Sequence, residues 1–290
     1  MVRLLETAAL SVFLLCLAGC AAPEPAPAPW DRIKIADLAP SGGAGEGGVE
    51  GLKTIGLNFY VFEMPAENVG ALDVVWQMLG LEPLRFNNYD AFRANSFIVG
   101  FGQDPLLNEV VGALDGAGGR RVQTVSLLLP DGYINDVSVS GVPGERSVFY
   151  TAADGSMKGV TVGPGRIALR LGGGILPGLR GLCEVGVEPV FVSGRRGGAA
   201  QVPVGERLAE YVFGSAGFHL KMSPGDFFFL GPEKYITDGA SLASHFFSRA
   251  SPDPRIKMFL LPGPGEGGKP EPYYGPVVLT YVILCTGVSD

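Results

Sequence analysis

The sequence holds few of the side chains that build metal and catalytic centres. Only two of its 290 residues are histidine and only four are cysteine. No HxH, HxxxH or CxxC spacing occurs, and each histidine stands among apolar neighbours, His219 in GFHLK and His245 in LASHFF. Because metal sites are assembled from such ligands at short spacings, the sequence predicts no metal site and no cofactor.

Charged residues are scarce as well. They make up 18% of the chain, and the net charge is −7. Proteins that bind nucleic acid need a dense basic surface against phosphate, so we expect no nucleic-acid partner. A hydrophobic content of 47% and a mean hydropathy of +0.26 exclude a disordered polyelectrolyte. The 44 glycines and 23 prolines predict a folded chain with many turns.

No apolar run near the amino terminus is long enough to cross a membrane. The run at residues 7–17 is shorter than the roughly 20 residues that a spanning helix needs. A charged start at Arg3, a short apolar run and small residues after it are typical of a signal peptide. The sequence therefore predicts an exported protein.

The end of this segment, Leu17, Ala18, Gly19 and Cys20, resembles the lipobox of bacterial lipoproteins. The resemblance covers residues 1–20 and implies a signal peptide at 1–19 and a mature chain that carries diacylglycerol on the Cys20 sulfur. Two or more acyl chains anchor a protein stably, since each buried methylene contributes about 0.8 kcal/mol. In this family an aspartate after the cysteine marks inner-membrane retention, so Ala21 favours the outer membrane, facing the periplasm. The alternative is an ordinary secretory signal with an incidental cysteine.

Residues 20–51 read as a tether. Proline at every second position from Pro23 to Pro29 favours an extended, stiff segment. The glycine-rich stretch at residues 41–51 favours a flexible coil.

Residues 52–130 predict a small α/β module of the order β-α-β-α-β. Strands are expected at 52–64, 97–101 and 122–129. One helix carries the apolar stripe from Val69 to Leu79, and another begins at Asp104 with Pro105 at its first position. The order of elements is similar to that of the small βαβ units that build the periplasmic rings of secretins, a likeness of element order alone.

Residues 131–290 predict a β-rich region, either a sandwich or a partly closed barrel, with one short helix at 240–247. The expected fold class is therefore α+β. No linker separates the two parts, because residues 129–132 (LPDG) read as a tight turn. The sequence leaves open whether they form one domain.

Two cysteines remain in the mature body, Cys183 and Cys285, both in predicted strands. In an exported protein they are candidates for a disulfide. The alternative is two separate buried thiols that behave as small apolar side chains.

Candidate chemistry in the body is sparse. Residues 214–217 (GSAG) place serine second and break the G-x-S-x-G elbow. Asp226, Glu233 and Asp238 are the carboxylates that a hydrolase acting on wall or polysaccharide would use. Residues 87–90 (NNYD) read as a capped loop, with calcium binding as the alternative.

Aromatic residues offer a candidate partner surface, with core packing as the alternative. The residues are Phe227, Phe229, Tyr273 and Tyr274. The function we expect is that of a lipid-anchored envelope lipoprotein that acts as a non-catalytic binding or assembly module. Its expected partners are the bilayer, through Cys20, and an envelope protein or a glycan. The alternative is an envelope hydrolase.

Overall fold

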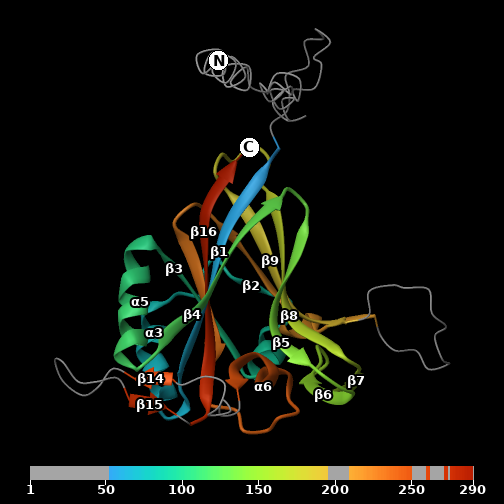
Figure 1. The fold of residues 1–290 in the computed structure, drawn as a ribbon. Helices are drawn as coiled ribbons and strands as arrows, with labels where there is room; N and C mark the ends of the chain where they lie inside the picture. The colour runs from blue at the N-terminus through green and yellow to red at the C-terminus, as the bar shows by residue number, and fades with distance from the viewer. Residues whose placement is uncertain (1–51, 195–208, 250–258, 262–270, 274, 290) are drawn as a thin grey trace, which may run out of the picture. The chain divides into compact units, whose positions relative to one another are not determined.

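The computed structural model describes residues 52–194, 209–249, 259–261, 271–273 and 275–289. Two antiparallel sheets of six strands form its framework (Figure 1). The first, sheet A, has the order β3-β12-β16-β1-β4, and a short sixth strand, β13, pairs with β16. Its strands are β1 (Thr54–Pro65), β3 (Phe97–Gln103), β4 (Arg120–Pro130), β12 (Asp226–Pro232), β13 (Ser248–Arg249) and β16 (Val277–Ser289).

The second, sheet B, has the order β2-β11-β9-β8-β5, and β10 pairs with β9. Its strands are β2 (Arg85–Phe86), β5 (Ile134–Val142), β8 (Gly165–Ile175), β9 (Cys183–Ser193), β10 (Glu210–Val212) and β11 (Phe218–Met222). Two further pairs of strands stand outside both sheets, β6 (Arg146–Thr151) with β7 (Met157–Val162), and β14 (Phe259–Leu261) with β15 (Glu271–Tyr273).

The main core lies between the two sheets. Alternate residues of β1, among them Leu57 and Phe59, face the same buried cluster as Leu169 and Leu171 of β8. The 3-10 helix η2 (Ala66–Ala71) and the helices α3 (Leu72–Met78) and α5 (Asp104–Gly116) cover the opposite face of sheet A (Figure 1). β12 lies between the main core and these helices, which explains why every residue of β12 is buried.

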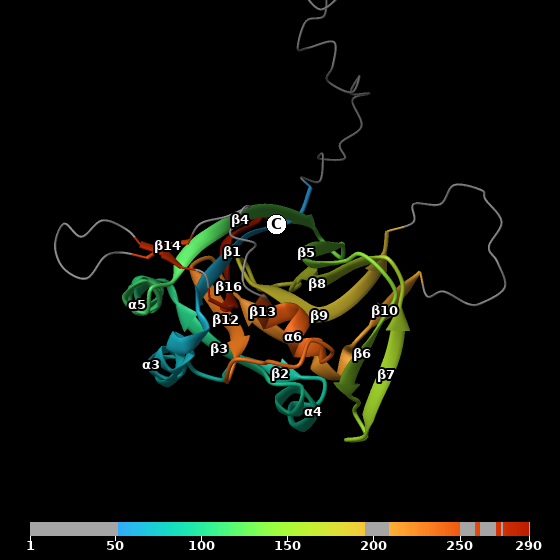
Figure 2. The same ribbon diagram turned by 60° about the horizontal axis from the view of Figure 1, so that its bottom comes forward.

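Three shorter elements complete the body: α4 (Tyr89–Ala94), the 3-10 helix η3 (Gly214–Ala216) and α6 (Leu242–Phe247). All six residues of α6 are buried, and Figure 2 shows this helix in the opening between the two sheets. Among the described helices, none combines the length and the apolar character that crossing a membrane requires.

The predicted β-rich architecture is confirmed in its coarse form, since the described sheets are antiparallel, open and partnered by helices, as in α+β folds. The separate N-terminal β-α-β-α-β module is not confirmed. Its elements occur in the expected order, but β12 and β16 from the second half of the chain lie between β3 and β1. β1 and β4 are antiparallel neighbours, whereas a βαβ unit joins parallel strands.

Candidate functional site

A cleft of about 420 Å³ opens where the hairpin β6–β7 meets the end of α4 and the loop that leads into α6. We call it the hairpin cleft. Its volume lies within the range of about 300–1,000 Å³ that is common for small-ligand sites. Side chains that line it include Ser96, Phe149, Tyr150, Tyr235, Thr237 and Asp238.

The hairpin wall of the cleft belongs to neither large sheet, and side chains from the body hold it in place. The Asn95 side chain is buried, donates to the Thr151 carbonyl (2.8 Å) and accepts from the Thr151 N–H (2.8 Å). The Ser215 hydroxyl donates to the same carbonyl (2.7 Å), and the Asn88 amide donates to the carbonyl of Ala153 (2.9 Å). An isolated hairpin is marginally stable in water, so these contacts fix the wall.

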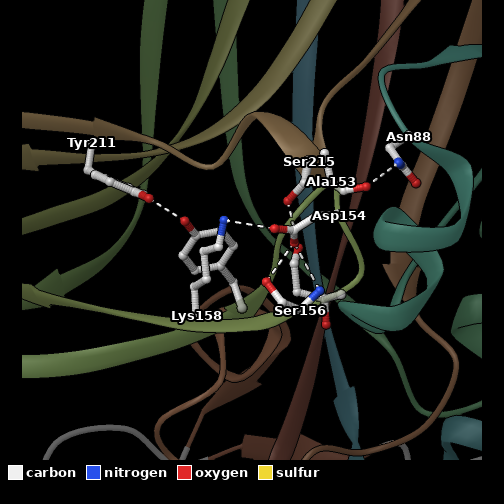
Figure 3. A network of polar contacts seen from close by, with 9 residues as sticks. Asn88, Ala153, Asp154, Ser156, Lys158, Tyr211 and Ser215 are labelled. Carbon is white, nitrogen blue, oxygen red and sulfur yellow. Dashed lines mark hydrogen bonds and ion pairs between the residues drawn. The ribbon is translucent and has the colours of Figure 1, made fainter.

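The turn of the hairpin has its own polar network, seen at close range in Figure 3. One Asp154 oxygen accepts from the N–H (3.0 Å) and the hydroxyl (2.6 Å) of Ser156, and Lys158 lies 3.2 Å from the other oxygen. Hydrogen bonds from Ser156 and Lys158 lower the pKa of Asp154 to about 2. Gly155, at φ 77°, supplies the left-handed residue of the turn.

The opposite wall is the loop before α6. One Asp238 oxygen accepts from the N–H groups of Ala240 (3.1 Å) and Ser241 (2.6 Å), and Ser241 in turn caps α6. The Phe149 N–H donates to the Ala240 carbonyl (2.8 Å), which ties this loop to β6. Burial alone raises the pKa of Asp238, but the hydrogen bonds from Ser241 and Ala240 outweigh burial, and the net pKa is lowered.

Ser96 lies between the two walls and has an unusual backbone. It follows the C-cap residue of α4, Asn95, with φ 63°, a left-handed conformation at the helix end that glycine usually occupies. The chain thus places a hydroxyl-bearing side chain at the cleft where the backbone alone would favour glycine.

The chemistry of the cleft suits binding of a ligand with an apolar face and several hydroxyls. Phe149 is 43% exposed and Met157 is 79% exposed, so apolar surface is available at the hairpin. Hydroxyls of Ser96 and Thr237 and the ammonium of Lys234 add polar groups to the lining. Asp238 already accepts two backbone hydrogen bonds, so its carboxylate maintains the loop.

The three carboxylates that the sequence offered for hydrolysis take separate structural positions. Asp226 is buried at the start of β12 and accepts from the Ser223 N–H (2.7 Å) and the Gln103 amide (3.2 Å). Glu233 follows the end of the same strand and pairs with Arg93 (3.3 Å). Seven strand residues at about 3.3 Å each separate Asp226 from Glu233 by roughly 20 Å, so these two do not face each other across a cleft.

Cys183 and Cys285 come from opposite sheets and meet in the core. Both are free thiols with no exposed surface. The Cys183 thiol donates to the Met222 carbonyl (3.4 Å), and the carbonyl of Cys285 accepts from the Gly225 N–H (2.9 Å), so both lie beside the connection from β11 to β12. A hydrogen bond between the two thiols, together with burial, raises the pKa of Cys183 above its usual range.

The structure corrects the predicted aromatic surface. Phe227 and Phe229 have no exposed surface and pack beneath the helices, with Phe229 4.8 Å from the Trp76 ring. They are core residues because α3 and α5 cover the face of sheet A to which they point. Only the backbone of Tyr273 is described, in β15, and Tyr274 and Cys20 lie outside the described residues.

The two histidines lie apart in the fold. His219 is partly buried on β11, whereas His245 is buried in α6 with its Nε2 atom unpaired. Burial, followed by the charge of Arg146, lowers the pKa of His245. Within the described part of the chain, no three histidine, cysteine or acidic side chains lie close enough to hold a metal ion.

Sequence reasoning missed the hairpin cleft because three distant segments line it, around residues 94–96, 149–157 and 234–242. One local signal did point to a wall of the cleft. Residues 87–90 were expected to form a capped loop, and Asn88 caps α4. Nothing in the sequence indicated that these segments meet.

No family model and no curated protein matches this chain. Among solved structures, the chain is similar to the InvG secretin domain β-barrel from the Salmonella SPI-1 injectisome NC-base. The identity is 10%, the TM-score is 0.23, and the match covers 82% of this chain and 64% of that chain. The chain thus spans less than two thirds of that structure, and a likeness at this TM-score supports no conclusion about fold or function.

Proposed function

We propose that this protein is a lipid-anchored lipoprotein of the bacterial envelope and that its body is a non-catalytic binding module. The anchor is the acylated Cys20, and the placement is the outer membrane facing the periplasm. The lipobox at residues 17–20 and the proline-rich segment after it support this proposal. The ligand site is the hairpin cleft, and its ligand is an envelope glycan.

The observation that carries the binding proposal is the construction of the cleft. Side chains of Asn95 and Asp238 bind backbone groups on its two walls, so the shape is set before a ligand arrives. Preorganised sites avoid the cost of ordering loops on binding. Phe149, Tyr150 and Tyr235 offer flat apolar surface to a sugar ring, and the hydroxyls of Ser96 and Thr237 can bond to sugar hydroxyls.

Titration of the full-length protein in detergent with oligosaccharide fragments of envelope glycans tests the ligand. We expect saturable binding in calorimetry and a loss of at least about tenfold in affinity for Phe149→Ala, since truncating a hot-spot side chain at the centre of a binding site costs about 2 kcal/mol or more. Leu81→Ala removes an exposed apolar side chain outside the cleft and serves as the matched control. Wild-type affinity in Phe149→Ala would show that the cleft is not the site, and absence of binding to every fragment would reject a glycan ligand.

The anchor is tested separately. We expect the wild-type chain to incorporate labelled palmitate and to fractionate with membranes, and Cys20→Ser to lose the label. The mass of the N-terminal peptide is the decisive measurement. A mature peptide that begins at another residue, or an unmodified Cys20, would contradict the anchor and leave the cleft experiment unaffected.

A further inference from the structure

Exposed apolar side chains gather at one end of the body. Among the residues that the structure describes, five large apolar side chains are more than 60% exposed, and four of them lie at this end: Leu52 (72%), Leu128 (68%), Tyr133 (65%) and Ile134 (61%). The fifth, Met157, is in the hairpin. With Leu179, which is 51% exposed, the four form what we call the tether-end patch.

Hydrogen bonds bring the segments that carry these five residues to the same end of the body, where Leu128 lies on the outer face of sheet A and Ile134 on the outer face of sheet B. The turn from β4 to β5 lies against the start of β1, since the Asp131 N–H donates to the Lys53 carbonyl (3.0 Å). The Gly132 N–H donates to the Gly173 carbonyl (2.8 Å). A side-chain oxygen of Asp131 accepts from the N–H of Ile175 (2.7 Å), the last residue of β8. The loop from β8 to β9, which carries Leu179, continues from that point.

This end is also where the chain enters the body. Leu52 is covalently joined to the tether, and Figure 1 shows β1 beginning and β16 ending at the same end, with the hairpin β6–β7 and α6 at the other. The patch therefore contains Leu52, the first described residue after residues 20–51 in the sequence. At about 3.6 Å per residue at most, 32 residues keep it within roughly 115 Å of Cys20.

The charges beside the patch favour an anionic surface. Lys53 and Arg180 are both exposed at this end, whereas the whole chain carries a net charge of −7. Two acids also lie at this end: Asp131, which has one oxygen engaged by the Ile175 N–H, and Glu184, which is opposite Gly174 of β8. Basic residues near a bilayer are attracted to anionic headgroups.

We propose that the tether-end patch rests on the lipid bilayer that carries the anchor, with Lys53 and Arg180 against anionic headgroups. This inference rests on the proposed anchor, because the tether holds the patch at a high effective concentration near the membrane. Weak contacts of five exposed side chains then suffice to orient the body. The hairpin cleft faces away from the bilayer.

Fluorescent probes in the full-length acylated protein test the orientation. Cysteine is introduced by Leu128→Cys in the patch or by Met157→Cys in the hairpin, each labelled with an environment-sensitive fluorophore, while native Cys183 and Cys285 are buried. On vesicles of phosphatidylethanolamine and phosphatidylglycerol that carry nitroxide headgroups, we expect at least twofold stronger quenching at position 128 than at position 157. We expect Lys53→Glu with Arg180→Glu to reduce that difference.

A second arm makes the test independent of acylation. A hexahistidine tag joined to residue 21, in place of the signal peptide and Cys20, attaches the same labelled proteins to vesicles that contain a nickel-chelating lipid. Equal quenching at positions 128 and 157 in this arm overturns the proposal, whatever the state of native Cys20. A blue shift at position 128 that appears without vesicles and grows with protein concentration also overturns it, because a second copy of the chain then covers the patch.

Discussion

At the scale of single residues, Asn95 is the side chain on which the hairpin cleft depends most directly. Its amide reaches the backbone of Thr151 on β6 with both donor and acceptor, and it also donates to Ala91 (2.7 Å) within α4. It therefore joins a helix to a hairpin that no sheet supports.

We expect Asn95→Ala to lower the free energy of unfolding by about 1–3 kcal/mol, because the half-buried Thr151 N–H loses its side-chain partner and the Thr151 carbonyl keeps only the bond from Ser215. Urea denaturation provides the measurement. Asn135→Ala, at an exposed position of β5, is the control and should stay within about 0.5 kcal/mol of wild type. An Asn95→Ala protein as stable as the control would show that Ser215 and Asn88 alone hold the hairpin.

His245 gives the body a dependence on pH. Burial and the charge of Arg146 lower its folded-state pKa, while Asp238 opposes them. As the pH falls, His245 is therefore protonated at a higher pH in the unfolded chain than in the folded protein. The free energy of unfolding decreases as the pH drops below the ordinary histidine pKa of about 6.5. It stops falling below the folded-state pKa.

We expect His245→Phe to flatten this part of the curve of unfolding free energy against pH. Wild type and variant are compared by urea denaturation between pH 8 and pH 5. Parallel curves across that interval would show that His245 takes no part in the dependence.

At the scale of elements, the hairpin β6–β7 is held by side chains rather than by sheet pairing, so its turn has a separate response to acid. Asp154 has a pKa lowered to about 2 from its ordinary 3.8. Its bonds to Ser156 and Lys158 are thus present above pH 4 and are lost as the pH falls through about 2.

We expect the Ser156 amide resonance to shift with a midpoint near pH 2, followed by NMR titration, and Asp154→Ala to remove that transition. A midpoint close to 3.8 in wild type would mean that the turn bonds do not persist in solution. The titration reports local order of the hairpin, not global unfolding.

Some elements were predictable from the sequence for identifiable reasons. Asp104 and Pro105 marked the start of α5 (Asp104–Gly116) to within one residue, but the N-cap is Gln103 and no side chain caps the helix. α4 was missed because its six residues are too few to show helical periodicity. Phe227 and Phe229 of β12 were a candidate partner surface with core packing as the alternative, and alternation in a strand does not reveal that helices cover their face.

At the scale of the whole molecule, the free thiols of Cys183 and Cys285 meet between the two sheets, one from each. In a periplasmic location, thiol–disulfide exchange with an oxidised protein disulfide would convert both thiols to one disulfide and reduce the partner by two electrons. In the chain-entropy model, a loop of about 100 residues adds up to about 4.7 kcal/mol of stability.

We expect protein isolated from the envelope without reductant to contain no alkylatable thiol at these positions after unfolding. In Cys285→Ser, the Cys183 thiol has lost its disulfide partner and should be alkylated. Mass spectrometry after alkylation distinguishes the two states. Two alkylated thiols in unreduced, unfolded wild type would establish the alternative, a pair of buried reduced cysteines.

The arrangement of the whole molecule was the part that sequence reasoning reached least. Turn signals and strand lengths predicted a β-rich body, yet they did not reveal that β12 and β16 are inserted between β3 and β1. Pairing between strands more than 150 residues apart, such as Tyr60 with Val282, leaves no local trace in one sequence.

The position of β1 determines how the body resists mechanical load. β1 lies between β16 and β4. Its first residue, Thr54, is opposite Ser289 of β16 on one side and opposite Pro130 of β4 on the other. If the proposed anchor and cleft ligand are right, a pull between membrane and ligand acts along β1, so many hydrogen bonds on both sides are sheared at once. A pull between the two chain termini instead breaks the hydrogen bonds between β1 and β16 one pair after another. The protein should therefore unfold at a much smaller force.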